Sequence, residues 1–343
     1  KGISKHFTGE NLDEAFGEKG FTYLCDKGHF FTSPYIKVHE CSMSGCKGVV
    51  KPASNYLMPE YGYITAASDK LSYRAGSPEK VGRLEIHSAI HTSSENDINF
   101  SYDDFSIIYK EKALIYGVNK GNKGLGFAIC TKCGYTESEI EKVNTGSYDK
   151  LPISFKKHSS IYSESSANIC LETSPTIWRN HNLIAKMITD AIMIIPKRDI
   201  KDITIAQTLA NAMQLSGAEE LGIDEREINA LIQEVDGKLS ILIYDNQSGG
   251  VGYVYDLAKN RWNDWLEKTK QRLFIDEKHN EECLNGCIKC VVTMNTSEPL
   301  PRRETLDYLE GKTMPKNEDI KIVKKKNIKK EISEEDRMKR FKK

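Results

Sequence analysis

Residues 238–253 read KLSILIYDNQSGGVGY, and they set the fold expected for the second half of the chain. The first part of this stretch, Lys238–Asp245, is an apolar run of the length typical of a buried strand. Three glycines follow, Gly249, Gly250 and Gly252, and a helical pattern comes next. A strand, a glycine-rich turn and a helix in this order predict an α/β unit.

The glycine turn could also present backbone N–H groups to a phosphate, because a helix N-terminus favours anions. It lacks the Lys-Ser/Thr pair of a P-loop, however, and it does not have the full G-x-G-x-x-G spacing. A tight turn that needs glycine is therefore the simpler interpretation. No other stretch of the sequence supplies the motifs of an ATPase.

Upstream, residues 182–195 (NLIAKMITDAIMII) predict a second buried strand, which we expect to end at Pro196. Asp190 lies within this run and would be costly to bury without partners. A hydrogen-bonded structural carboxylate is the simpler role for Asp190, and a functional one is the alternative. Residues 203–216 carry apolar residues at helical spacing and predict a helix.

Asp224 and Glu227 together resemble a capping box, which is a signature of a helix start. The apolar residues that follow have helical spacing: Ile228, Leu231, Ile232 and Val235. This segment therefore predicts another helix with these side chains on one face.

The nine cysteines form three groups of three: Cys25, Cys41 and Cys46; Cys130, Cys133 and Cys170; Cys283, Cys287 and Cys290. An odd count without a secretory signal argues against a disulfide framework, and short spacings favour metal binding. A structural zinc ion is held by four Cys or His side chains in tetrahedral geometry. We therefore expect between one and three structural zinc ions.

The first and last groups leave the fourth ligand open. In the first group His29 would complete a set of three thiolates and one imidazole, and His39 competes for that place. The last group, Cys283-Leu-Asn-Gly-Cys287-Ile-Lys-Cys290, is the strongest local signal. Its fourth ligand could be His279, Glu281 or water.

The middle group begins with Cys130-Thr-Lys-Cys133-Gly134, which has the knuckle form of a zinc ribbon. Glycine at position 134 suits the positive φ of such a turn. His158 and Cys170 could supply the second half of this site.

None of the three sites is expected to be catalytic. A catalytic zinc usually keeps one coordination position open and has a carboxylate base nearby. The chain contains neither His-Glu-x-x-His nor the deaminase pattern of His-x-Glu followed by Pro-Cys-x-x-Cys. Three thiolate-rich sites predict stabilisation of the fold, so no catalytic residue is assigned.

At 343 residues the chain is long enough for two or three domains, or for one with insertions. We expect an α+β protein with a zinc module at 1–60, a β-rich segment at 61–127, a zinc-ribbon-like module at 128–180, an α/β domain at 181–310 and a basic tail at 311–343. The net charge is zero, but the tail carries 13 Lys and Arg against 6 Asp and Glu. Such a tail could follow phosphates or simply be solvated.

The longest apolar stretch, Ala191 to Ile195, is far too short to cross a bilayer, and no signal peptide opens the sequence. These features predict a cytoplasmic protein without membrane contact. Because the first residue is Lys1, either the start was removed or the sequence is part of a longer protein.

The motifs of the second half carry a family resemblance. They are Lys186-Met-Ile-Thr-Asp190, Thr208-Leu-Ala, Tyr244-Asp245, Gly249-Gly250-Val-Gly252-Tyr253 and Cys283…Cys287-Ile-Lys-Cys290, followed by Asn295 and a helix at Arg303…Leu306. In this order they resemble the MrfA-type zinc-binding domain, which occurs at the C-terminus of certain superfamily 2 DNA helicases and in stand-alone partner proteins. The resemblance covers residues 180–310.

The first half resembles the same group of proteins. Its matching motifs are Cys25-Asp-Lys-Gly-His29 with Cys41 and Cys46, Tyr61-Gly-Tyr-Ile-Thr65, and Cys130-x-x-Cys133-Gly134 with His158 and Cys170. The first of these is similar to the zinc module of DrmB, the helicase partner of the DISARM anti-phage system. Two features depart from the helicase-fused pattern: Glu281 stands before Cys283, and no Walker A or DEAD/DEAH box occurs.

The resemblance implies a non-catalytic zinc-binding accessory subunit or domain. It would partner a superfamily 2 helicase or translocase of the DrmA type and help to bind DNA, in anti-phage defence or DNA repair, without a small-molecule substrate. Two alternatives remain open from the sequence. One is a protein-interaction scaffold without DNA contact, and the other is a metal-dependent nuclease built on Asp190, Asp245 and the glycine turn.

Overall fold

The computed structural model describes residues 2–3, 15–42, 46–51, 54–60, 63–64, 84–88, 97–121, 124–141, 153–156, 158, 170, 177–235, 237–293 and 299–312. Three sequence predictions lie outside these residues: the basic tail beyond residue 312, Asn295, and the Tyr61–Thr65 motif except for its residues 63–64.

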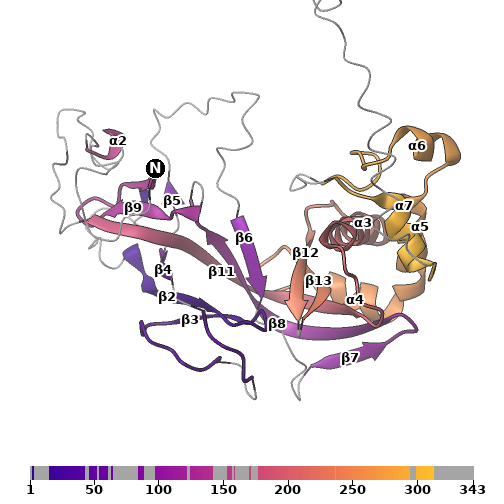
Figure 1. Ribbon diagram of the computed structural model, residues 1–343, viewed down its shortest axis with the longest axis horizontal. Coiled ribbons are helices and arrows are strands. Elements are labelled where there is room, and N and C mark those ends of the chain that lie inside the picture. Colours follow the sequence, from indigo (N-terminus) through magenta and orange to yellow (C-terminus); the bar gives the residue numbers. More distant parts are fainter. Residues whose placement is uncertain are drawn as a thin grey trace, which may run out of the picture.

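Two long antiparallel strands, β8 (Phe105–Asn119) and β11 (Ile177–Pro196), run through the molecule and join its two halves (Figure 1). Their pairing extends from Leu183 opposite Asn119 to Pro196 opposite Phe105. The predicted strand at 182–195 is confirmed: it begins earlier, at Ile177, and it ends at the expected proline. Among the described residues, eleven strands form one sheet around this pair.

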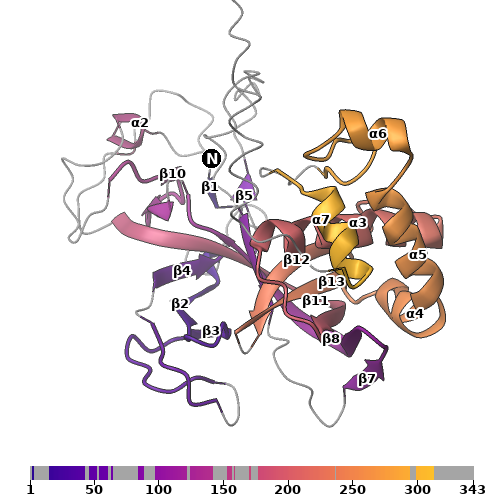
Figure 2. The same ribbon diagram turned by 45° about the vertical axis from the view of Figure 1, so that its right-hand side comes forward.

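The C-terminal half adds a hairpin and a layer of helices to this sheet (Figure 2). The hairpin strand β13 pairs with β11 and with β12. The elements are α3 (Ile203–Leu221), β12 (Ile228–Val235), β13 (Lys238–Asp245), α4 (Tyr253–Asn260), α5 (Trp262–Leu273), α6 (Glu277–Glu282) and α7 (Arg302–Leu309). The strand–turn–helix order predicted from residues 238–253 is thus observed.

The main core lies between the sheet and these helices. Side chains alternate along a strand, so Ile192 and Ile194 of β11 face the helices, whereas Ala191 and Met193 belong to a smaller cluster on the other face. Trp265 of α5 is fully buried in the main core, and its indole N–H donates to the carbonyl of Met213 at 2.9 Å. Burial of large apolar side chains such as this one is the dominant stabilising contribution.

The described part of the N-terminal half is built mainly from short strands. β4 and β9 both pair with β11, and β2 and β3 extend the sheet from β4. The elements are β1 (Gly2–Ile3), β2 (Glu18–Leu24), β3 (Phe30–Ser33), β4 (Ser54–Met58), β5 (Tyr63–Ile64), β6 (Leu84–Ser88), β7 (Ile98–Ser101), β9 (Phe127–Cys130), β10 (Thr136–Ser138) and α2 (Ile153–Lys156). β6 and β7 pair with β8, and β1 pairs with β5.

The helix predicted from Asp224 and Glu227 is wrong. Residues 228–235 form β12, which pairs with β13 along its whole length, from Ile228 opposite Asp245 to Val235 opposite Lys238. The missed signal is the Asp-Gly pair at 236–237, which favours a two-residue hairpin turn. Gly237 has the positive φ of such a turn. The Asp224 carboxylate accepts from the N–H and the guanidinium of Arg226.

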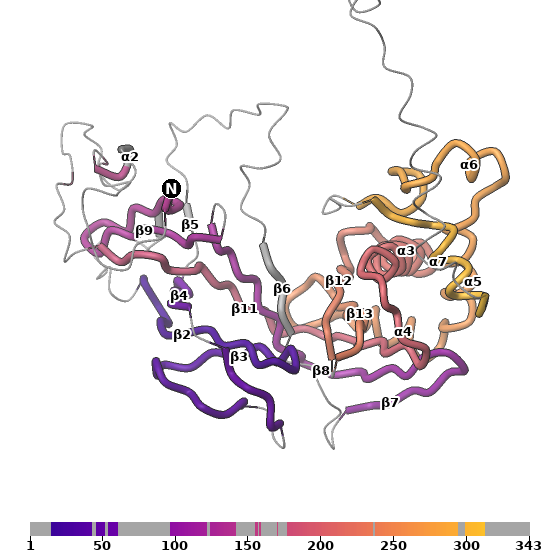
Figure 3. The backbone as a smooth tube through the Cα atoms, viewed as in Figure 1, coloured from indigo at the N-terminus to yellow at the C-terminus, as the bar shows by residue number. Residues whose placement is uncertain are grey.

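The mixed α+β class is confirmed, with a strand-rich sheet and helices concentrated in the C-terminal half (Figure 3). β11 crosses the predicted boundary at residue 180, so the segments at 128–180 and 181–310 share one strand. The division into segments stays a prediction. No helix within the described residues has the length and apolar character needed to cross a membrane.

Candidate metal centres

The structure gathers all nine cysteines into three tetrads, each with three thiols and one imidazole. The ligand atoms within each tetrad lie within 4.8 Å of one another. The N-terminal tetrad is Cys25, His29, Cys41 and Cys46; the middle tetrad is Cys130, Cys133, His158 and Cys170; the C-terminal tetrad is His279, Cys283, Cys287 and Cys290. The middle tetrad, beside β9 and α2, and the C-terminal tetrad, beside α6, lie at opposite ends of the molecule in both views (Figures 1 and 2).

The N-terminal tetrad closes the β2–β3 hairpin. Cys25 follows β2 directly, and Gly28, at φ +85°, turns the chain so that its N–H donates to the Cys25 carbonyl at 3.0 Å. This turn brings back His29, whose Nδ1 lies 3.3 Å from the sulfur of Cys41. The turn also packs tightly on the C-terminal half, since a Cβ atom at Gly28 would lie 2.4 Å from the Glu234 carbonyl oxygen of β12.

The middle tetrad is built on the predicted knuckle. β9 ends at Cys130, and β10 pairs back onto it. Gly134 has φ +74° and donates its N–H to the Cys130 carbonyl at 2.9 Å. The sulfurs of Cys130 and Cys170 are 3.9 Å apart. Residues forty positions apart in the sequence therefore meet at one point.

His158 is oriented within the middle tetrad by its neighbours. Its Nδ1 lies against the Phe155 carbonyl, which can only accept a hydrogen bond, so this nitrogen carries the proton and Nε2 is the one that would bind a metal. The ring of Tyr135 stacks on the imidazole at 4.6 Å. Hydrogen bonds from the thiol of Cys133 and from His158 lower the pKa of Cys130 to about 5, although burial opposes this.

The C-terminal tetrad is formed by α6 and the loop after it. His279 lies in α6, Cys283 ends that helix, and Cys287 and Cys290 follow in a turn. The Cys290 sulfur is 3.9 Å from that of Cys283 and 3.6 Å from that of Cys287, and the Cys287 sulfur is 3.9 Å from His279 Nε2. Burial raises the pKa of the Cys290 thiol to about 11.

Polar side chains of the surrounding helices donate hydrogen bonds to backbone carbonyls in and beside the loop that carries this tetrad. Arg302 of α7 donates to the carbonyls of Cys283 at 2.8 Å and Leu273 at 3.0 Å. Arg272 of α5 donates to the Cys290 carbonyl at 3.2 Å, and Asn211 of α3 donates to the next carbonyl along the chain at 3.1 Å. The loop is therefore attached to three helices of the main core.

These distances fit zinc. All nine cysteines are free, and sulfur separations of 3.6–3.9 Å are far longer than a disulfide bond. A tetrahedral zinc ion with bonds of about 2.3 Å to sulfur would separate its thiolates by about 3.8 Å. Three thiolates and one imidazole also form a common donor set for structural zinc. All three tetrads can therefore hold zinc, with every coordination position filled by protein.

The structure places one histidine in each of the two groups for which the sequence left the fourth ligand open. His29, rather than His39, joins the first three thiols, and His279, rather than Glu281, joins the last three. Sequence reasoning missed Arg302, because nothing in the chain distinguishes it from its exposed neighbour Arg303. Gly286, at φ +77°, packs against Val291 and Leu300.

The glycine turn binds a carboxylate of its own chain. Asp245 is fully buried, and its two oxygens accept hydrogen bonds from four successive backbone N–H groups, residues 251–254, at 2.8–3.2 Å. Burial raises the pKa of Asp245, and these four donors act against that rise. The donors that a phosphate would need are therefore already used by Asp245.

Asp190 is held beside this turn. It lies at a β-bulge, where Glu111 and Lys112 of β8 oppose the single residue Asp190 of β11. Its carboxylate is so close to Gly250 that a Cβ atom there would lie 2.5 Å away. The structure thus brings Asp190, Asp245 and the glycines together. The two carboxylates contact backbone atoms of the glycine turn.

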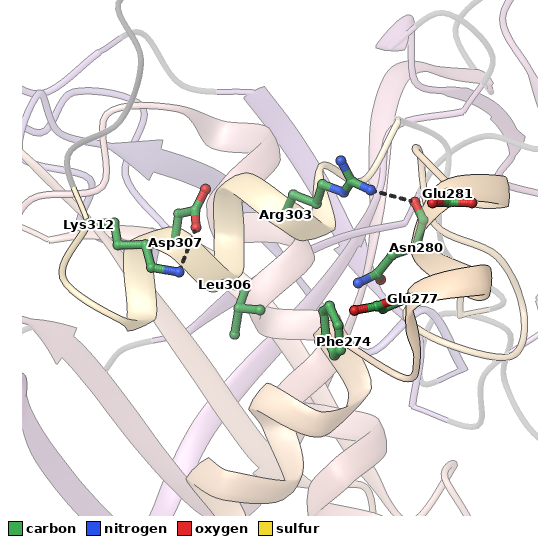
Figure 4. Close-up of a pocket in the computed structure, with 8 residues that line it drawn as sticks. All are labelled: Phe274, Glu277, Asn280, Glu281, Arg303, Leu306, Asp307 and Lys312. Atoms are coloured by element: carbon green, nitrogen blue, oxygen red, sulfur yellow. Dashed lines mark hydrogen bonds and ion pairs between the residues drawn. The ribbon is translucent and has the colours of Figure 1, made fainter.

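A groove of about 480 Å³ lies between α6 and α7 (Figure 4). It is lined by Phe274, Glu277, Asn280, Glu281, Arg303, Leu306, Asp307 and Lys312. Arg303 donates to the Asn280 carbonyl at 3.2 Å, and Lys312 pairs with Asp307 at 3.4 Å. The groove contains no ligand of the tetrad and is of mixed charge, so no function is assigned to it.

Residues 209–291 match the family model of the MrfA Zn-binding domain. This stretch starts within α3 and ends one residue after Cys290, so it contains the whole C-terminal tetrad. No curated protein matches the chain.

Among the solved structures that are similar to this chain are three crystal structures of the DUF1998 helicase MrfA. With DNA bound, the identity is 17%, the TM-score is 0.40, and the match covers 67% of this chain and 25% of that one. With DNA and AMPPNP bound, the identity is 12%, the TM-score is 0.32, and the match covers 67% of this chain and 22% of that one. For the third MrfA structure the identity is 12%, the TM-score is 0.31, and the match covers 61% of this chain and 22% of that one. The chain spans about a quarter of the length of these helicases.

Proposed function

We propose that this chain is a non-catalytic, zinc-stabilised accessory module that works with a superfamily 2 DNA helicase and contacts DNA. The observation that carries the proposal is the match of residues 209–291 to the MrfA Zn-binding domain, together with the tetrad that closes this region. MrfA is described as a helicase. A module of this family without motor motifs of its own is suited to serve a motor elsewhere, on another chain or in another part of the protein.

Two features support a non-catalytic role. Each tetrad supplies four protein ligands, so a bound zinc ion would have no open position for water or substrate. The carboxylates that could have formed a nuclease site are engaged within the fold: Asp245 by four backbone N–H groups, and Asp190 against Gly250.

The narrower form of the proposal is a DrmB-like subunit that partners a DrmA-like helicase in cytoplasmic anti-phage defence. Its support is the order of motifs in the first half, where Cys25, His29, Cys41 and Cys46 form the N-terminal tetrad. This form adds a specific partner, and the broader proposal does not depend on it.

The partner is tested by purifying the tagged chain from its host, with and without nuclease, and identifying co-purifying chains by mass spectrometry. A superfamily 2 helicase in both samples is the expected result. The absence of any motor from both samples, when the gene encodes no helicase upstream of Lys1, would contradict the proposal.

DNA contact is tested by titrating labelled single- and double-stranded DNA at increasing salt. Phosphate-dominated binding should weaken at least tenfold between about 50 and about 200 mM salt. Binding that is absent or independent of salt would leave a protein-interaction scaffold in place of a DNA-binding module.

A further inference from the structure

Arg302 carries a full positive charge into the interior. Its side chain is 1% exposed, and arginine stays protonated in proteins. Its hydrogen bonds go to neutral carbonyls: Leu273 at 3.0 Å, Cys283 at 2.8 Å and His279 at 3.5 Å. Within the described residues no carboxylate pairs with Arg302, and its buried Nε has no hydrogen-bond partner.

The two neighbouring arginines differ from Arg302 in this respect. Arg272 donates to the Cys290 carbonyl, but it also pairs with Glu219 at 2.9 Å and is partly exposed. Arg303 is exposed to solvent and donates to the Asn280 carbonyl at 3.2 Å. Among the described residues, Arg302 is thus the arginine of this group that has no carboxylate partner and almost no exposure to solvent.

An unbalanced buried charge is strongly unfavourable, and buried charges in proteins are paired or lie near bound ions. Two of the carbonyls that Arg302 binds belong to metal ligands, Cys283 and His279. Three thiolates, a neutral imidazole and a divalent zinc ion carry a net charge of minus one in total. The zinc-loaded tetrad would therefore supply the missing negative charge at the right place.

We propose that Arg302 is the counter-charge and positioning residue of the C-terminal metal centre, so that burial of Arg302 and occupancy by zinc stabilise each other. This inference rests on the proposed function in one respect, which is that the C-terminal tetrad holds zinc. It adds a consequence for the fold. Because Arg302 joins α7 to the ends of α5 and α6, loss of zinc should weaken the attachment of α7 to its neighbours.

The proposal makes the effect of Arg302 depend on zinc. With zinc bound, its charge is balanced and stabilises the site. Without zinc the anionic metal centre is absent, and replacing Arg302 by an apolar side chain should cost little stability or even raise it. A purely structural role, through hydrogen bonds to carbonyls alone, would instead lower stability equally in both states.

The test uses R302M, R302K and the control R303M in the full chain. Zinc ions per chain are counted by native mass spectrometry in competition with a chelator, and thermal midpoints are measured with and without zinc. R302M should lower zinc affinity at one site by about 10- to 100-fold, R302K should retain most of the affinity, and R303M should stay within about twofold of wild type. The midpoint of R302M should fall only in the zinc-bound state.

Each contrary outcome is distinct. Equal loss of stability by R302M with and without zinc would overturn the proposal in favour of a structural role. If R302M does not fold, the same comparison is made with R302Q. If wild type and Cys287→Ser hold the same number of zinc ions, the zinc assignment in the proposed function fails and the inference fails with it. If wild type holds zinc at this site and R302M binds it equally well, the inference alone fails.

Discussion

The two halves of the long sheet are stabilised by different means. In the described part of the C-terminal half, 27 buried residues from strands, helices and the loops between them form one continuous core. Among the described residues around the middle tetrad, the corresponding cluster has five buried members, and two of them, Cys130 and Cys133, are themselves candidate ligands. A cluster of this size offsets little of the entropy of ordering a loop, so we expect a metal ion to supply much of the stability there.

The C-terminal tetrad occupies an intermediate position in this comparison. Cys290 is part of the main core, and three helices hold the loop by hydrogen bonds from Arg302, Arg272 and Asn211. Zinc there would reinforce a loop that the core already holds. Zinc binding is thus expected to contribute more to stability at the middle tetrad than at the C-terminal tetrad.

The largest expected effect comes from removing a ligand of the middle tetrad. Cys133→Ser should release one zinc ion and unfold the knuckle, because the turn between β9 and β10 carries two of the four candidate ligands. Hydrogen exchange of the β9 and β10 amides should accelerate by on the order of a hundredfold or more, with α3 unchanged. Cys287→Ser is the matched variant, and its effect should be confined to α6, its loop and the attachment of α7. If faster exchange extended over equally many amides in both variants, the two halves would not differ in their dependence on zinc.

In the main core, Trp265→Ala should lower the free energy of unfolding by about 4 kcal/mol. The substitution leaves a cavity at a fully buried position and removes the hydrogen bond to the Met213 carbonyl. Chemical denaturation of the zinc-loaded protein measures this change, and all three zinc ions should remain bound in the native state. A loss below about 1 kcal/mol would show that the helical layer is less important than the core cluster indicates.

The buried ion pair between Glu139 and Arg179 connects the middle module to β11. The two side chains are joined by hydrogen bonds of 2.6 and 2.8 Å and are almost completely buried. Glu139→Gln leaves the guanidinium without a charge partner and should cost about 3 kcal/mol of local stability. Faster hydrogen exchange of the amides in β9 and at the start of β11 would measure this loss of stability. Unchanged exchange there would mean that the metal site alone fixes this module.

The smallest expected effect distinguishes two adjacent glycines of the C-terminal half. Gly249 and Gly250 both have positive φ, but only at Gly250 would a Cβ atom meet the Asp190 carboxylate, at 2.5 Å. Gly249→Ala should cost about 1 kcal/mol from backbone strain, and Gly250→Ala about 2 kcal/mol more. Thermal unfolding of the two variants compares them directly. Equal losses would show that the close approach of Asp190 has no energetic weight.

The metal ligands were largely predictable because short spacings and turn glycines are local signals. Cys130 to Gly134 and Cys283 to Cys290 could be assigned from a few residues each. The fourth ligands could not be chosen locally, because His29 and His39 both lie close to a cysteine in sequence. The Gly28 turn brings His29 to the sulfur of Cys41 in the folded chain.

Strands were predictable where a continuous apolar run had the length of a buried strand, as in residues 182–195 and 238–245. Residues 228–235 were not, because their apolar spacing suits a helix while their partner in β13 imposes a strand. The role of Arg302 depends on three carbonyls from separate segments, and no sequence pattern contains that information.

The zinc content of the purified full-length chain tests the central claim most directly. Native mass spectrometry of the wild type should find three zinc ions per chain. One serine variant for each tetrad, Cys25→Ser, Cys133→Ser and Cys287→Ser, should each retain two. A wild type that binds no zinc, or variants that keep the full number of ions, would contradict the account of a zinc-stabilised module.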